Sequence, residues 1–149
     1  MYDSKEDTLK HRERVYVFLN SIRYKLGVRG LEHDGSKLQA PEKEVFDRIT
    51  PKLKGLTYGS KEYKDSLKEM GTALEHHYKN NSHHPEYYDN GILDMSLIDI
   101  IEMLADWKAA TLRHANGDIR KSLEINKKRF EIPESLYQIL QNTIDEMGW

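Results

Sequence analysis

The fold is decided by the most apolar segment of the chain, residues 96–107, which reads SLIDIIEMLADW. Ser96 favours a helix start, because its hydroxyl can accept a hydrogen bond from a backbone N–H of the first turn. Apolar side chains then recur at helical spacing, at Leu97, Ile100, Ile101, Leu104, Ala105 and Trp107. This spacing predicts a buried helix from Leu97 to about His114. Asp106 lies inside that helix, where a carboxylate is costly unless it is paired or binds an ion.

Helical spacing of apolar residues extends over most of the remaining sequence. The expected helices are residues 4–27, 41–52, 60–79, 118–130 and 133–147, with a short, partly helical segment at 28–37. In the first of them His11 shares a face with Val15 and Phe18, so its imidazole is expected to be buried. Since no strand pattern or internal repeat is present, the sequence predicts an all-α fold, a single-domain bundle of about six helices.

The composition narrows the class of protein. The chain has 149 residues and a formal net charge of -2, so no domain-wide positive field exists to hold a nucleic-acid backbone. With no cysteine, any metal must be held by nitrogen and oxygen ligands. No apolar run reaches the roughly 18 residues of a membrane span, and the charged N-terminal residues do not resemble a secretory signal. We therefore expect a soluble cytoplasmic protein.

The dipeptide His33-Asp34 is the most informative polar feature of the sequence. It follows His11 and precedes Asp106, and the segments that carry these residues are far apart in the chain. Two imidazoles and two carboxylates are a ligand set that a divalent transition metal accepts readily. If the expected helices converge, these residues predict a metal site.

Four more histidines lie within nine residues, namely His76, His77, His83 and His84. His77 falls on the apolar face of its expected helix and is predicted to point inward, whereas His76 is rotated about 100° away from it. His83 and His84 precede Pro85 and fall in a loop, and we expect at least one of them to be a ligand. His76 and His114 are expected at the surface.

Taken in this order on an all-α chain, His11, His33-Asp34 and Asp106 resemble the HD-domain superfamily of metal-dependent phosphohydrolases. The stretch His33-Asp34-Gly35-Ser36-Lys37 is similar to the HD-x-x-K form of the central motif. Met103-Leu104-Ala105-Asp106 is similar to the alanine-aspartate that closes the motif. The resemblance implies a helical bundle and ligation of a first metal by His11, His33, Asp34 and Asp106.

Members of that superfamily with two metals add histidines between the central pair and the final aspartate. By this resemblance His77 and one or both of His83 and His84 would bind the second ion, with His84 as the first choice. The run His83-His84-Pro85-Glu86 is similar to the HHE of the cyclic-dinucleotide branch, but the GYP tripeptide of that branch is absent, so its specificity is not carried over. The whole chain is similar to a small group of bacterial and phage HD-like proteins. This resemblance implies no particular activity, and it implies the host cytoplasm if a phage encodes the protein.

Other polar residues are candidates for catalysis and substrate binding. Lys37, three residues after Asp34, could steady the charge of a phosphate or be a solvated lysine. Glu86 could shuttle a proton or support a ligating histidine. Substrate contacts are expected from Lys37, His83, Lys108 and Arg113, and catalytic roles from Lys37, Asp34 and Glu86.

Together these residues predict a metal-dependent phosphohydrolase that acts on a small phosphate ester, with a nucleotide as the first candidate. The expected cofactor is one or two divalent ions per chain, of Mn, Fe, Co, Zn, Ni or Mg. Two alternatives stay open: an HD-type di-iron oxygenase, similar to myo-inositol oxygenase, and a non-catalytic module that binds a nucleotide or a metal. The expected partner is a small-molecule phosphate substrate, with no membrane, no general nucleic-acid binding, and room for a homodimer.

Overall fold

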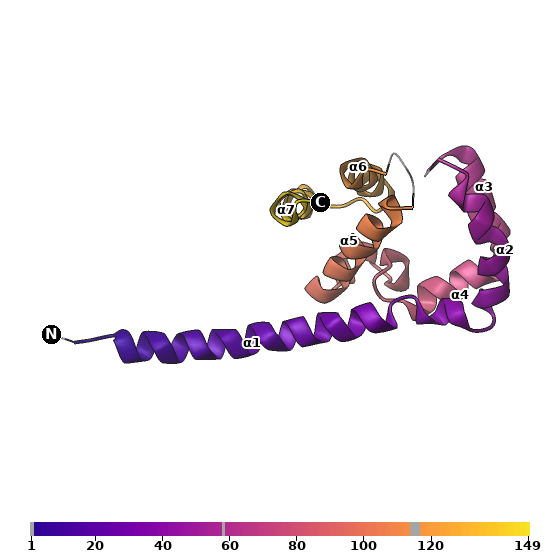
Figure 1. The fold of residues 1–149 in the computed structure, drawn as a ribbon. Coiled ribbons are helices and arrows are strands. Elements are labelled where there is room, and N and C mark those ends of the chain that lie inside the picture. Colours follow the sequence, from indigo (N-terminus) through magenta and orange to yellow (C-terminus); the bar gives the residue numbers. More distant parts are fainter. Residues whose placement is uncertain (1, 58, 114–116) are drawn as a thin grey trace. The chain divides into compact units, whose positions relative to one another are not determined.

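A computed structural model describes residues 2–57, 59–113 and 117–149, and every regular element in these residues is a helix (Figure 1). The predicted all-α class is thereby confirmed. The α-helices are α1 (Lys5–Glu32), α2 (Glu42–Lys54), α3 (Lys61–Glu69), α4 (Thr72–Asn80), α5 (Leu97–Thr111), α6 (Ile119–Arg129) and α7 (Glu134–Met147). Short 3-10 helices are η1 (Gly35–Leu38), η2 (Pro85–Tyr87) and η3 (Gly91–Asp94). Within the described residues, no helix combines the length and the apolar character that a membrane span requires.

The chain divides into two compact units, Met1–His33 and Asp34–Trp149. The first unit is the single helix α1, which contains no buried residue. Since burial of His11 would require a surface outside this unit, it stays a prediction. Gly27, expected to end the helix, keeps a helical conformation, since an interior glycine costs only about 1 kcal/mol relative to alanine. The single-domain organisation stays a prediction.

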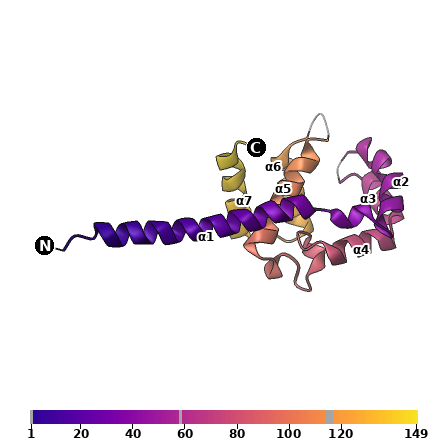
Figure 2. The same cartoon turned by 60° about the horizontal axis from the view of Figure 1, so that its bottom comes forward.

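The first part of the second unit is formed by α2, α3 and α4 (Figure 2). The sequence predicted one helix from Ser60 onward, with Ser60 as its cap. The cap is confirmed, since Ser60 Oγ accepts a hydrogen bond from the Tyr63 N–H at 3.1 Å. The helix is divided into α3 and α4, however, because Gly71 has a φ of 51°, a conformation that glycine adopts without steric cost.

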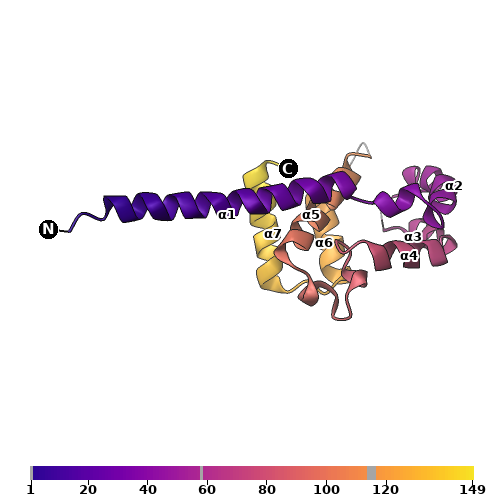
Figure 3. The same cartoon turned by 90° about the horizontal axis from the view of Figure 1, so that it is seen from below.

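The main apolar core of the second unit lies among α5, α6 and α7 (Figure 3). Its most deeply buried members are Met103, Leu104, Ile119, Leu123, Leu140 and Ile144. The predicted apolar face of α5 is only partly correct, because Leu97 is 64% exposed whereas Met103 is 1% exposed. The buried face of α5 is the one that α6 and α7 cover, and spacing along α5 alone does not specify it.

The loop between α4 and α5 is fastened to α5 by the buried carboxylate of Asp99. This carboxylate accepts hydrogen bonds from Ser82 Oγ and from the Tyr88 hydroxyl, each at 2.8 Å. It also accepts one from the Ser96 N–H at 3.0 Å, while Ser96 Oγ accepts one from the Asp99 N–H at 3.2 Å. The predicted Ser96 cap is thus one half of a capping box, in which the two residues satisfy each other's backbone N–H groups.

Replacing Asp99 by Asn is expected to lower the free energy of unfolding by about 2–3 kcal/mol, because an amide N–H₂ then faces hydroxyl and N–H donors in a buried site. Urea denaturation followed by circular dichroism measures this change. Asp89→Asn, on the exposed part of the same loop, is the control and should leave the stability as it is. A loss of similar size in both variants would contradict the fastening role of Asp99.

Candidate metal centre

Three imidazoles and one carboxylate meet where α4, the loop after it and η1 come together. His77 belongs to α4, His83 and His84 lie in the following loop, and Asp34 precedes η1. One potential ligand atom of each residue lies within 4.8 Å of all the others. These four residues, Asp34, His77, His83 and His84, are termed the histidine cluster below.

The potential ligand atoms of the histidine cluster are closely spaced, and His77 and His83 are buried whereas Asp34 and His84 are partly buried. His77 Nε2 lies 2.9 Å from His84 Nε2 and 3.3 Å from Asp34 Oδ1. His83 Nε2 lies 3.6 Å from the same Asp34 oxygen, and both of these atoms are fully buried. Two ligand atoms that bind one ion at ~2.0–2.2 Å in tetrahedral geometry are roughly 3.3–3.6 Å apart. The spacing of the cluster therefore suits a shared ion.

The hydrogen bonds of His77 fix its ring proton on Nδ1. This atom lies 2.9 Å from Glu42 Oε2 and 3.1 Å from Asn81 Nδ2. Both N–H groups of Asn81, however, already donate at 2.8 Å, one to Ser36 Oγ and one to the His77 carbonyl. The network therefore assigns the Nδ1 proton to the bond with Glu42, so that the Nε2 lone pair is directed at the histidine cluster.

Glu42 is the most deeply placed carboxylate beside the cluster, with a side chain that is 0% exposed. In addition to the His77 bond, its oxygens lie 2.7 Å from His76 Nδ1 and accept a bond from Ser36 Oγ at 2.9 Å. His76, which was expected at the surface, is half-exposed, and its Nδ1 contact helps to hold the Glu42 carboxylate. With several partners on a buried carboxylate, the orientation of Glu42 and hence of the His77 ring is strongly constrained.

On the other side of the histidine cluster, α5 presents two carboxylates to the loop. Glu102 Oε1 lies 3.2 Å from His83 Nδ1, and the Glu102 side chain is 9% exposed. Asp106 follows one helical turn later, on the same side of α5. Potential ligand atoms of His83 and Asp106 lie within 4.8 Å of one another, which puts the predicted Asp106 beside the cluster. A carboxylate on the far nitrogen of a ligating histidine is a recurrent feature of metal sites.

Asp34 reaches the cluster through an unusual backbone conformation, with φ 57° and ψ 17°. Aspartate is one of the few residues besides glycine that adopt this left-handed region readily. One carboxylate oxygen faces the imidazoles, and the other forms a salt bridge with Lys37 Nζ. The Lys37 ammonium also lies 4.9 Å from the centre of the Phe46 ring. A positive charge is thus held directly beside the cluster.

Burial lowers the pKa of two imidazoles of the cluster, those of His77 and His84, and so favours their neutral form. Loss of solvation on burial lowers the pKa of His77, and the charge of Lys37 lowers it further, against the opposite effect of Asp34. Burial, together with the neighbouring His83 and His77, lowers the pKa of His84 to about 3, although Asp106 opposes the shift. Since neutral imidazole is the form that coordinates a metal, these rings need not lose a proton first at neutral pH.

The structure brings together several of the ligands that the sequence predicted. Asp34, His77 and His84 are members of the cluster, and His83, expected to contact substrate, is buried among them. His11 and His33 belong to the first unit, so their ligand roles stay predictions.

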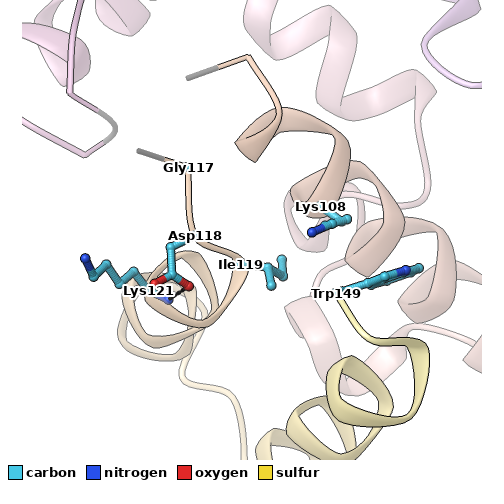
Figure 4. A pocket seen from close by; sticks show the side chains of 6 residues that line it. All are labelled: Lys108, Gly117, Asp118, Ile119, Lys121 and Trp149. Atoms are coloured by element: carbon cyan, nitrogen blue, oxygen red, sulfur yellow. Dashed lines mark hydrogen bonds between the residues drawn. The ribbon is translucent and has the colours of Figure 1, made fainter. Parts of the chain in front are cut away.

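Three of the predicted catalytic or substrate-binding residues lie outside the histidine cluster. The Glu86 carboxylate pairs with Arg129 at 2.6 Å. Lys108 lines a cavity of about 490 Å³ together with Trp149 and the first residues of α6 (Figure 4), and none of the described residues that line it belongs to the cluster. Arg113 is exposed just after α5. The roles of Glu86, Lys108 and Arg113 stay predictions.

Two residues of the site escaped the sequence analysis, Glu42 and Glu102. Glu42 was treated only as part of a helix that begins near Pro41, and its partner His77 is 35 residues away. Glu102 falls in the expected buried helix that begins at Leu97 and has no predicted role there. The one sequence signal that bore on Glu102 is its spacing of four residues before Asp106, which puts both carboxylates on one side of α5.

Comparison with known proteins gives a family but no function. No curated protein and no solved structure matches the chain. A family model does match, over residues 1–146, and its description is a family of unknown function, DUF5662. Because that match spans far more than half of the 149 residues, the chain belongs to the DUF5662 family.

Proposed function

We propose that this protein is a metal-dependent phosphohydrolase that binds its divalent ion at the histidine cluster. The observation that carries the proposal is the approach of His77 Nε2 to His84 Nε2 and Asp34 Oδ1, at 2.9 and 3.3 Å. The Nδ1 proton of His77 is at the same time committed to buried Glu42. The lone pairs of the two Nε2 atoms and of Asp34 Oδ1 therefore face one another in a region with little water. A cation stabilises such an arrangement.

The donor set favours a transition metal over calcium or magnesium. Imidazole nitrogen suits Zn, Fe, Co, Ni and Mn, whereas calcium and magnesium prefer oxygen ligands throughout. Without an ion, a single proton shared by His77 Nε2 and His84 Nε2 accounts for their 2.9 Å separation. An ion at the cluster takes the place of that proton. His83 and Asp34 complete the set, and Asp106 stands beside His83 for a second ion.

Phosphohydrolysis is the reaction that best uses these groups. When bound, a divalent ion polarises a phosphoryl oxygen and activates a water for attack on phosphorus. Lys37, which is 29% exposed and paired with the outer oxygen of Asp34, can turn its ammonium to a phosphate oxygen as the ester arrives. The resemblance of His33-Asp34 and Asp106 to the HD motif supports the same reaction.

Metal binding is the first test of this proposal. Glu42→Gln is expected to weaken the binding of Zn²⁺ or Mn²⁺ by about 10–100-fold, because the amide no longer holds the His77 ring proton as a carboxylate does. Asp34→Asn should weaken it at least as much, while asparagine still tolerates the left-handed backbone. Isothermal titration calorimetry with elemental analysis measures both effects.

Glu44→Gln, exposed on the same helix as Glu42, is the matched control and should bind metal like the wild type. His11→Ala and His33→Ala report on the two ligand roles that stay predictions. If the wild type retains no divalent ion, or if Glu42→Gln retains it unchanged, the metal centre is not where we propose it.

Turnover is the second test. Purified protein with Mn²⁺, Co²⁺ or Mg²⁺ should release phosphate from at least one member of a nucleotide panel, and Lys37→Ala should lower kcat by about 10²–10³-fold, because a charge that stabilises the transition state is lost. The metal content of this variant should stay that of the wild type. Lys43→Ala, whose lysine is exposed and pairs with Asp47, is the control. Metal binding without phosphate release under all these conditions would instead favour the non-catalytic module.

The lowered pKa of His84 also predicts how stability depends on pH. The group titrates at about 3 in the folded chain and near its ordinary value of 6.5 once unfolded. Between these values the unfolded chain binds the additional proton, so the free energy of unfolding of the metal-free protein should fall as the pH drops from about 6.5 toward 3. His84→Gln removes this contribution. Urea denaturation at pH ~7.5 and pH ~5 should therefore show a smaller loss of stability in His84→Gln than in the wild type, and equal losses would refute the assignment.

A further inference from the structure

A second cavity of the unit Asp34–Trp149 lies between α3 and α6, with a volume of about 620 Å³. Its apolar wall is formed by Tyr63 and Leu67 of α3 and by Ile125 of α6. This volume is in the range of cavities that hold small organic ligands, which are about 300–1,000 Å³. A flat aromatic group can therefore be accommodated against the Tyr63 ring.

The rim of this cavity is positively charged. Lys64, Lys128 and Arg129 line it together with the carboxylate of Glu124, and Arg129 is itself paired with Glu86 at 2.6 Å. Neither the Lys64 nor the Lys128 ammonium takes part in an ion pair among the described residues, so both charges are available to a ligand. An apolar wall with a cationic rim selects an anion that carries an apolar or aromatic body.

One side of the cavity is linked to the histidine cluster by direct contacts. Arg129, which lines the cavity, donates a hydrogen bond to the Tyr78 hydroxyl at 3.2 Å. The Tyr78 ring in turn lies 5.0 Å from the His84 ring, measured between ring centres. A single tyrosine side chain thus lies between the lining of the cavity and the cluster.

We propose that the cavity between α3 and α6 is the specificity pocket for the organic part of the substrate, an aromatic group joined to a phosphate. The aromatic group lies against Tyr63, Leu67 and Ile125, and the phosphate lies on the Arg129 side, toward the histidine cluster. Lys64 and Lys128 add electrostatic attraction for the anion. The assignment of the cavity as a substrate pocket rests on the proposed function. Binding of the aromatic phosphate in the cavity, however, requires no metal.

Calorimetric titration of the metal-free protein with AMP, GMP, CMP and UMP tests the pocket, with ribose 5-phosphate as the ligand that lacks the aromatic base. At least one nucleotide should bind about tenfold more tightly than ribose 5-phosphate, the gain expected from one stacked base. Ile125→Trp, which fills the cavity from a position that is 41% exposed, should abolish this preference. Ile139→Trp, at an exposed position of α7, should leave it intact. Lys64→Ala should lower the affinity for the nucleotide and reduce its dependence on salt.

These experiments distinguish an error in the proposed pocket from an error in the proposed metal centre. If no nucleotide binds better than ribose 5-phosphate, or if Ile125→Trp binds like the wild type, the pocket is wrong even when metal binding and turnover are intact. If nucleotide binding and its loss in Ile125→Trp are found but no metal binds, the pocket stands and the phosphohydrolase proposal falls. Elemental analysis of Ile125→Trp should give the metal content of the wild type.

Discussion

The candidate site depends on one constraint, the commitment of histidine Nδ1 atoms to buried carboxylates. Glu42 holds the Nδ1 proton of His77, and Glu102 lies against Nδ1 of His83. With that nitrogen occupied, the Nε2 atoms of both rings are directed to the same small volume as Asp34 Oδ1. Burial lowers the pKa of His77 and favours its neutral form, so that its Nε2 lone pair is directed there. Lone pairs that converge in this way form an arrangement that a bound cation would stabilise, as we propose.

The fold supports this arrangement mainly through α5. Three carboxylates on this helix, those of Asp99, Glu102 and Asp106, act on the loop that carries His83 and His84. Asp99 fastens the loop, Glu102 orients a ring, and Asp106 adds negative charge. Met103, Leu104 and Trp107 on the same helix form the apolar core with α6 and α7. The position of the loop is therefore coupled to the core through a single rigid element.

Part of this could be predicted from the sequence, and the rest required distances that no local pattern contains. Periodicity identified the helices and the inward position of His77, because spacing along one helix determines which residues share a face. The break at Gly71 was missed, because apolar residues keep the same spacing across it. Glu42 was missed because its role arises from a contact with a residue 35 positions away. Sequence reasoning found the candidate ligands and missed the carboxylates that orient them.

Anomalous X-ray scattering from crystals grown with Zn²⁺ or Mn²⁺ tests the central claim most directly. The account predicts a strong peak at ~2.0–2.3 Å from Nε2 of His77 and His84 and from a carboxylate oxygen of Asp34. In that structure the Nδ1 atoms of His77 and His83 should still face Glu42 and Glu102. A fully metal-loaded protein whose anomalous peaks all lie away from these residues would contradict the account.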